Sequence, residues 1–174
     1  MSLKVDRKGL RSVSFLVISV CGVVLLFPIL GLRINLTSSH VPVGLWRAYP
    51  ADSVSVGDVI TFDVYDLFFE SPQVYDERMK FDSSKLLKKV AALPGAVIER
   101  SGDLVIIDGK ELQGAKIMKN SWCRVEYPLV VPDGAVWLMA DSETAFDSRY
   151  HGPLPVRLIR EKNKPVLVWR RGAN

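Results

Sequence analysis

Twenty-one consecutive residues near the start of the chain, from Ser12 to Leu32, contain no charged side chain. Their sequence is SVSFLVISVCGVVLLFPILGL. As an α-helix rising 1.5 Å per residue, this run is roughly 32 Å long, which matches the hydrocarbon core of a bilayer. A cleaved secretory signal has a shorter apolar region followed by a small-residue cleavage site, and the sequence shows neither. The run therefore predicts one retained transmembrane helix over residues 12–32.

The basic side chains before this run predict the direction of the helix. Residues 1–11 carry a net charge of +3, because four basic residues stand against one acidic residue: Lys4, Arg7, Lys8 and Arg11 against Asp6. Lysine and arginine beside a membrane helix favour the cytoplasmic side. We therefore expect a basic cytoplasmic tail over residues 1–11 and a domain outside the cytoplasm over residues 33–174. In a bacterial inner membrane, that domain lies in the periplasm.

The rest of the chain is close to electrically balanced. All 174 residues together carry +4, so only about +1 remains after residue 11. A nucleic-acid surface needs far more clustered positive charge, and no nucleic-acid partner is expected. Cys21 and Cys123 should lie in different media and are not expected to pair. With His40 and His151 as the only histidines, neither a metal nor another cofactor is predicted.

Short apolar runs separated by turn residues follow the predicted helix and predict a mostly β domain. The runs are SVSVGDVITFDV, KKVAALPGAVIER, LVIIDGKEL, AVWLMAD, and the pair PVRLIR and PVLVWR on either side of EKNK. IDGK has the Asp-Gly signature of a hairpin, and PDGA before VWLMA is a second turn.

The segment from Tyr65 to Leu87 does not follow this strand rhythm. It mixes aromatic and charged residues, and a short helix is expected to start near Ser71 and Pro72. The segment is interpreted as a flap or an insertion. Its three adjacent apolar residues either belong to the core or rest on lipid headgroups: Leu67, Phe68 and Phe69.

Three separated motifs contain residues suited to catalysis. SSHVP follows the apolar run and offers Ser38 and Ser39 before Pro42. LLKKVAALPGAVIE puts two lysines in an apolar run, where burying an ammonium group costs free energy unless it has a role or reaches solvent. MADSETAFDSRYHGPLP gathers acidic, hydroxyl and basic side chains after a strand. SSHVP is informative only beside the other two motifs.

In this order, the motifs resemble the type I signal peptidase superfamily, whose members are membrane-anchored serine endopeptidases with an antiparallel β fold. In that family, S-x-x-P carries the nucleophile, K-[RK]-x-x-x-L-P-G carries a lysine base, and a segment ending in D-S-R-x-x-G closes the site. Pro42 to Trp46, PVGLW, is similar to the TraF-type branch, which serves conjugative transfer.

The resemblance assigns roles position by position. Ser39 is the expected nucleophile, and Ser38 replaces it if the loop register differs by one. Lys88 is the expected general base, with Lys89 at the neighbouring basic position. The expected oxyanion hole combines the Ser39 N–H with the Thr37 hydroxyl, and the supporting residues are Asp147 and Arg149 as an ion pair. Asp141 is either a site residue or an ordinary turn aspartate.

The third motif departs from the family pattern. Ala140 and Ser142 replace a glycine and an asparagine, and Ala145 stands where typical members have a serine that holds the lysine. Thr144 is the candidate replacement for that hydroxyl. A Ser/His/Asp arrangement using His40 or His151 is the alternative, and the lysine at the base position argues against it.

The resemblance implies processing of a membrane-embedded pilin precursor, either by hydrolysis or by joining the chain ends into a circle. A neutral lysine amine can take the serine proton if burial lowers its pKa by several units. Two other functions stay open. A general signal peptidase would process many exported precursors, whereas a non-catalytic bitopic assembly protein would not need Ser39.

Overall fold

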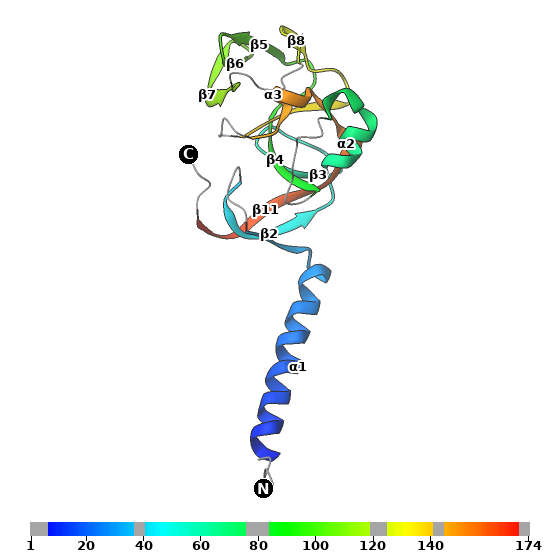
Figure 1. The fold of residues 1–174 in the computed structure, drawn as a ribbon, viewed down its shortest axis with the longest axis vertical. Coiled ribbons are helices and arrows are strands. Elements are labelled where there is room, and N and C mark those ends of the chain that lie inside the picture. Colours follow the sequence, from blue (N-terminus) through cyan, green and yellow to red (C-terminus); the bar gives the residue numbers. More distant parts are fainter. Residues whose placement is uncertain (1–6, 37–40, 76–83, 119–124, 141–144, 171–174) are drawn as a thin grey trace.

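The computed structural model of the protein describes residues 7–36, 41–75, 84–118, 125–140 and 145–170. The chain begins with helix α1 (Arg7–Ile29), which projects from one end of a β domain (Figure 1). Among the described residues, no helix combines the length and apolarity that crossing a bilayer requires. The transmembrane helix expected over residues 12–32 therefore stays a prediction.

Two antiparallel sheets make up the domain, which confirms the mostly β class. The larger sheet has seven strands in the order β1-β2-β11-β3-β4-β9-β10. In chain order these are β1 (Leu32–Asn35), β2 (Val43–Tyr49), β3 (Val59–Asp63), β4 (Lys85–Ala92), β9 (Ala135–Met139), β10 (Leu154–Pro155) and β11 (Ile159–Arg170). The smaller sheet has the order β7-β6-β5-β8 and lies at the end of the molecule away from α1 (Figure 1). Its strands are β5 (Val97–Ser101), β6 (Leu104–Ile107), β7 (Lys110–Lys116) and β8 (Leu129–Val130).

The core lies between the central strands of the larger sheet and the short elements packed on them, and it continues into β5 and β6 of the smaller sheet. Its largest fully buried apolar side chains are Trp137, Phe62, Ile60, Leu67, Ile98 and Leu138. Helix α2 (Val64–Glu70), the 3-10 turns Pro72–Val74 and Val156–Leu158, and helix α3 (Ser148–His151) are the remaining elements. Burial of this apolar area is the main term that stabilises the fold.

Both predicted turns are confirmed. Asp108 and Gly109 connect β6 to β7 with φ values of 49° and 74°, the positive pair that a two-residue hairpin turn requires. Between β8 and β9, the Ala135 N–H donates to the Pro132 carbonyl at 3.2 Å. Local turn chemistry was enough to locate these two connections.

The expected break at EKNK is wrong, because residues 161–164 lie inside the single long strand β11. This strand pairs with β2 on one side and β3 on the other. Asn163 is buried, and its amide donates to the Thr61 hydroxyl at 2.8 Å. Pairing on both edges thus outweighs the local polarity. Part of PVRLIR also forms the 3-10 turn Val156–Leu158 rather than a strand, and in SVSVGDVITFDV only Val59–Asp63 is extended.

The helix expected near Ser71 and Pro72 begins earlier. Asp63 caps α2, with its side chain accepting from the Tyr65 N–H at 3.0 Å, and only a single 3-10 turn starts at Pro72. Leu67 and Phe68 are core residues, whereas Phe69 is 87% exposed. Residues 76–83 of the segment interpreted as a flap or insertion lie outside the described residues.

Candidate active site

Lys88 lies on the inner face of β4, in the middle of the larger sheet. It stands opposite Ile60 of β3, and the neighbouring residue on the same face, Val90, is fully buried. The Lys88 residue itself is only 2% exposed. Lys89 points to the other face and is exposed, as strand alternation requires. Only the first of the two motif lysines therefore lies in an apolar interior.

Burial gives Lys88 an unusual proton affinity. It lowers the pKa of the ammonium group from 10.5 to about 8, while the nearby Asp147 carboxylate raises it in part and the Arg149 guanidinium lowers it further. Desolvation disfavours the charged form of a buried lysine, and this effect is the largest here. A substantial fraction of Lys88 is a neutral amine near pH 8, which is the form that can accept a proton.

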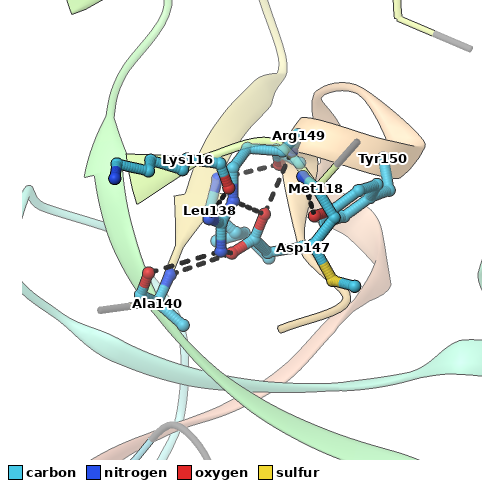
Figure 2. A network of polar contacts seen from close by, with 8 residues as sticks. Lys116, Met118, Leu138, Ala140, Asp147, Arg149 and Tyr150 are labelled. Carbon is cyan, nitrogen blue, oxygen red and sulfur yellow. Dashed lines mark hydrogen bonds and ion pairs between the residues drawn. The ribbon is translucent and has the colours of Figure 1, made fainter. Parts of the chain in front are cut away.

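Asp147 and Arg149, whose charges both act on Lys88, form a buried ion pair with each other. Figure 2 shows this pair and its hydrogen-bond partners. The Arg149 Nη2 donates to Asp147 Oδ2 at 2.7 Å, and Nε donates to Oδ1 at 2.8 Å. Both side chains are fully buried. A two-point arginine–carboxylate contact of this kind fixes the position of both groups as well as pairing their charges.

The same pair joins α3 to two strands. The Ala140 N–H donates to Asp147 Oδ2 at 3.0 Å, and Arg149 Nη1 donates to the Lys116 carbonyl at 2.7 Å (Figure 2). The Ser148 hydroxyl accepts from the Leu138 N–H at 2.9 Å. Asp147 also caps α3 by accepting from the Arg149 N–H. These bonds occupy the carboxylate fully, so Asp147 suits a supporting role and not proton transfer.

His151 is buried on the same side of the domain. Its ring contacts those of Phe62 and Phe146 at centroid distances of 6.0 and 5.3 Å. Burial lowers the pKa of His151 to about 3, the Gly152 backbone opposes this shift, and the charge of Lys88 adds to it. Because Asp147 pairs with Arg149, the described residues contain no histidine–aspartate couple of the kind a Ser/His/Asp site needs.

Several predicted site residues lie outside the described part of the chain. They are Thr37, Ser38, Ser39, His40, Asp141, Ser142 and Thr144. Ala145, at the position where typical family members carry a serine, is fully buried and offers no hydroxyl. The roles predicted for Ser39 and Lys88 stay predictions, as do the oxyanion hole and the replacement by Thr144.

Two side chains to which the sequence analysis gave no role in the site, Asn35 and Trp46, border the serine motif. The Asn35 amide donates to the carbonyls of Val41 and Pro42 at 3.1 and 3.2 Å. The Trp46 indole N–H donates to the same Pro42 carbonyl at 3.1 Å. The β1–β2 connection that holds the two serines is thus tied at both ends. An asparagine at the end of a short strand gave no local signal for this role, because its partners lie six and seven residues away.

The described arrangement suits acid–base chemistry by a lysine. It provides a buried amine with a lowered pKa, an ion pair whose charges act on that amine, and hydrogen bonds from Asn35 to Val41 and Pro42. Among the described residues, no three His, Cys, Asp or Glu side chains gather into a metal-binding cluster.

Comparisons with known proteins place the chain in a family and give several relatives. The signal peptidase family, peptidase S26, matches residues 10–169. The conjugal transfer protein TraF of Agrobacterium fabrum is 33% identical over 152 residues, which cover 80% of this chain and 84% of that protein. A probable signal peptidase I-1 of Synechocystis sp. is 36% identical over 106 residues, 60% of this chain and 50% of that protein. A crystal structure of a signal peptidase I from Enterococcus faecalis covers 64% of this chain and 97% of its own, at a TM-score of 0.41 and 20% identity.

Proposed function

We propose a function for this chain from the premise that it belongs to the peptidase S26 family of signal peptidases. The proposed activity is that of a serine endopeptidase in which Ser39 is the nucleophile and Lys88 is the general base. Lys88 carries the proposal, because it is a buried lysine with a pKa of about 8 next to a fixed ion pair. A lysine with the ordinary value would hold its proton and could not act as a base near neutral pH.

The proposed reaction has two steps. The neutral Lys88 amine takes the proton from the Ser39 hydroxyl as its oxygen attacks the scissile carbonyl, and the resulting ammonium gives a proton to the departing amine. The Ser39 N–H and the Thr37 hydroxyl stabilise the oxyanion, each donor contributing about 3 kcal/mol. Water or a second amine then releases the acyl group and regenerates the Ser39 hydroxyl.

The proposed substrate is a pilin precursor of a conjugative transfer system. Support comes from the relative whose printed name is conjugal transfer protein TraF. Release by water gives a trimmed linear chain. Release by the substrate's own N-terminal amine gives a cyclic chain, when that amine is held near the ester and water is kept away.

The proposed location follows from the uncharged run. Residues 12–32 anchor the chain in a bacterial inner membrane, residues 1–11 lie in the cytoplasm, and residues 33–174 lie in the periplasm. Because β1 starts at Leu32, the loop with Ser39 follows the anchor after only a few residues. A cleavage site at the membrane surface suits this arrangement.

A general signal peptidase is the second candidate, and the Synechocystis relative favours it. The two candidates share their chemistry and differ in breadth of substrate. Deleting a general peptidase causes many exported precursors to accumulate, whereas deleting a pilin peptidase causes one to accumulate. Comparing the membrane and periplasmic proteomes of cells with and without the protein distinguishes them.

The activity is tested by producing the full chain in membranes together with a candidate pilin precursor. The product is weighed by mass spectrometry for the wild type, Ser39→Ala, Ser38→Ala and Lys88→Ala. We expect processing to be lost in Ser39→Ala and Lys88→Ala only, and a product one water lighter than the trimmed linear chain identifies cyclisation. If Ser38→Ala loses processing and Ser39→Ala keeps it, the nucleophile is Ser38 and not Ser39. Processing by all four proteins favours a non-catalytic assembly protein.

A further inference from the structure

Strands β2 and β11 present a row of cations on one face of the larger sheet. Their register pairs Arg47 with Lys164 and Tyr49 with Lys162, so all four side chains share that face. The Arg47 guanidinium carbon lies 5.4 Å from the centre of the Tyr49 ring, and the Lys164 ammonium lies 5.6 Å from the same centre. One tyrosine ring thus contacts both cations. Arg47, Tyr49 and Lys164 are called the cation pair site below.

The neighbouring cations differ from these two in having a carboxylate in direct contact, whereas Asp58 attracts Lys164 only from a longer distance. Lys162 contacts the Asp58 carboxylate at 3.1 Å, and Arg33 contacts Glu161 at 3.5 Å. Within the described part of the chain, neither Arg47 nor Lys164 has a carboxylate within 4.0 Å. Like charges directly opposite each other on adjacent strands repel. An anion bound between them would remove this repulsion.

The cation pair site lies next to the point where the chain leaves α1. Leu32, the last residue of the uncharged run, stands opposite Arg47 in the β1–β2 register. The Ala48 N–H donates to the Gly31 carbonyl at 2.8 Å, which ties the end of the helix to β2. Gly31 has a φ of +68°, and a Cβ there would lie 3.0 Å from the Ala48 oxygen, so glycine permits this close approach. Figure 1 shows β2 and β11 crossing the end of the domain nearest α1.

Strand spacing limits how far the two cations lie from the end of the uncharged run. Adjacent strands are about 5 Å apart, so Arg47 lies one spacing from Leu32 and Lys164 two spacings. The headgroup layer on each side of a bilayer is roughly 5–8 Å thick. If Leu32 marks the edge of the hydrocarbon core, both cations are within reach of the phosphate groups.

We infer that Arg47, Lys164 and Tyr49 bind the phosphate of an anionic phospholipid headgroup. This inference rests on the membrane anchor in the proposed function. The Arg47 guanidinium can donate two parallel hydrogen bonds to phosphate oxygens, and the Lys164 ammonium adds a second charge. Because β2 also pairs with Asn35 at the start of the serine loop, a lipid held here fixes the height of that loop above the bilayer.

Lipid retention by the full chain in mild detergent tests the inference. The protein is mixed with phosphatidylglycerol or phosphatidylcholine, and native mass spectrometry measures the bound fraction. The test variant is Arg47→Gln with Lys164→Gln. The matched control is Arg100→Gln with Lys110→Gln, which removes the same charge from exposed positions on the distant smaller sheet. The basic tail of residues 1–11 is present in all three proteins, so its lipid attraction cancels in the comparison.

We expect the wild type and the control to retain phosphatidylglycerol over phosphatidylcholine, and the test variant to retain at least fivefold less phosphatidylglycerol. Equal retention by all three proteins overturns the inference. Displacement of the lipid by millimolar inorganic phosphate also overturns it, because the site would then take free phosphate. Circular dichroism checks folding, and Arg47→Lys, which keeps the charge but loses the two-point contact, should show an intermediate loss.

The readout needs no substrate, so it separates this inference from the proposed activity. A chain that retains lipid but never processes a pilin leaves the lipid site standing while the peptidase proposal fails. If the chain is recovered from cells in the soluble fraction, the proposed membrane anchor is wrong. Lipid retention in detergent then still measures whether Arg47 and Lys164 bind phosphatidylglycerol.

Discussion

Lys88 is the residue at which activity and stability oppose each other. Its pKa of about 8 in the folded protein lies below the ordinary value of 10.5, so the unfolded chain binds more protons between these two pH values. Stability therefore rises with pH through this window, and below pH 8 the cost of a buried charge is present in full. A neutral side chain of similar length avoids that cost.

Lys88→Met should therefore stabilise the protein and abolish processing. We expect the free energy of unfolding at pH 7 to rise by up to about 3 kcal/mol, and the gain to shrink by pH 9.5. Denaturation of the full chain in detergent at both pH values measures this. The control is Lys89→Met on the exposed face of the same strand, which should show no such pH dependence. A Lys88→Met protein that is less stable at pH 7 contradicts a buried charge at this position.

His151 should make the wild type sensitive to acid. Its folded pKa of about 3 lies below the unfolded value of about 6.5, so stability falls as the pH drops below 6.5. His151→Phe keeps the ring packing against Phe62 and Phe146 and removes the proton site. The melting temperature of the variant should fall less than that of the wild type between pH 7 and pH 4.5. Parallel curves for the two proteins would show that His151 is not the acid-sensitive group.

The candidate site could be predicted from the sequence only where the chemistry is local to a motif. Lys88 and Lys89 were both identifiable because an ammonium group in an apolar run is costly, and the family resemblance then selected Lys88. The hydrogen-bond partners of Asn35 and Ser148 were not predictable, because a bond from an asparagine to Pro42, or from Leu138 to a serine, depends on how the chain folds back. Such partners leave no pattern in the residues beside them.

At the scale of elements, the close approach of β2 and β11 depends on Gly44. A Cβ at this position would lie 2.3 Å from the Leu167 carbonyl oxygen and 3.1 Å from the Val168 Cα. Both atoms are backbone, so the strands would have to separate. The contact lies where β1 also pairs with β2, opposite Asn35.

Gly44→Ala should lower the melting temperature and weaken processing through the serine loop. A loss of about 1–3 kcal/mol is expected for a clash that forces backbone shifts. The matched control is Gly22→Ala in α1, where nothing lies within 4 Å of the added carbon and alanine favours a helix. Thermal unfolding of both variants in detergent compares them, and equal stability for the two would mean that the strands adjust at no cost.

Elements with strong local signals were predictable, and those set by distant pairing were not. The Asp108–Gly109 turn needs two residues with positive φ, which its sequence supplies. The composition of EKNK is typical of a turn. Residues 161–164 are extended instead, because β3 pairs with residues 161–163 and β2 pairs with residues 162–164. The start of α2 was missed although Asp63 is a favourable capping residue, because Ser71 and Pro72 gave a competing signal.

At the scale of the whole molecule, the order of parts along the chain sets the geometry. Helix α1 leads directly into β1, and β1 leads into the serine loop. The mostly β class and the family could both be predicted from the sequence. The strand order β1-β2-β11-β3-β4-β9-β10 could not, since the last long strand inserts between β2 and β3.

The proposed topology predicts that the domain is reached from the periplasm. In spheroplasts, added protease should digest residues 33–174 and leave a short membrane fragment, and alkaline carbonate should leave the intact chain in the membrane pellet. Lysed cells serve as the control for digestion. A chain that carbonate releases, or that protease attacks only after lysis, contradicts a periplasmic domain on a retained helix.

In the proposed mechanism, Lys88 activates Ser39, which then forms an acyl-enzyme with the substrate. Quenching the reaction with a pilin precursor in acid, digesting the enzyme and locating the acylated peptide by mass spectrometry tests it directly. We expect an ester on Ser39 in the wild type and no ester in Lys88→Met. An ester on Ser38, an ester that forms without Lys88, or processing with no ester on either serine would contradict it.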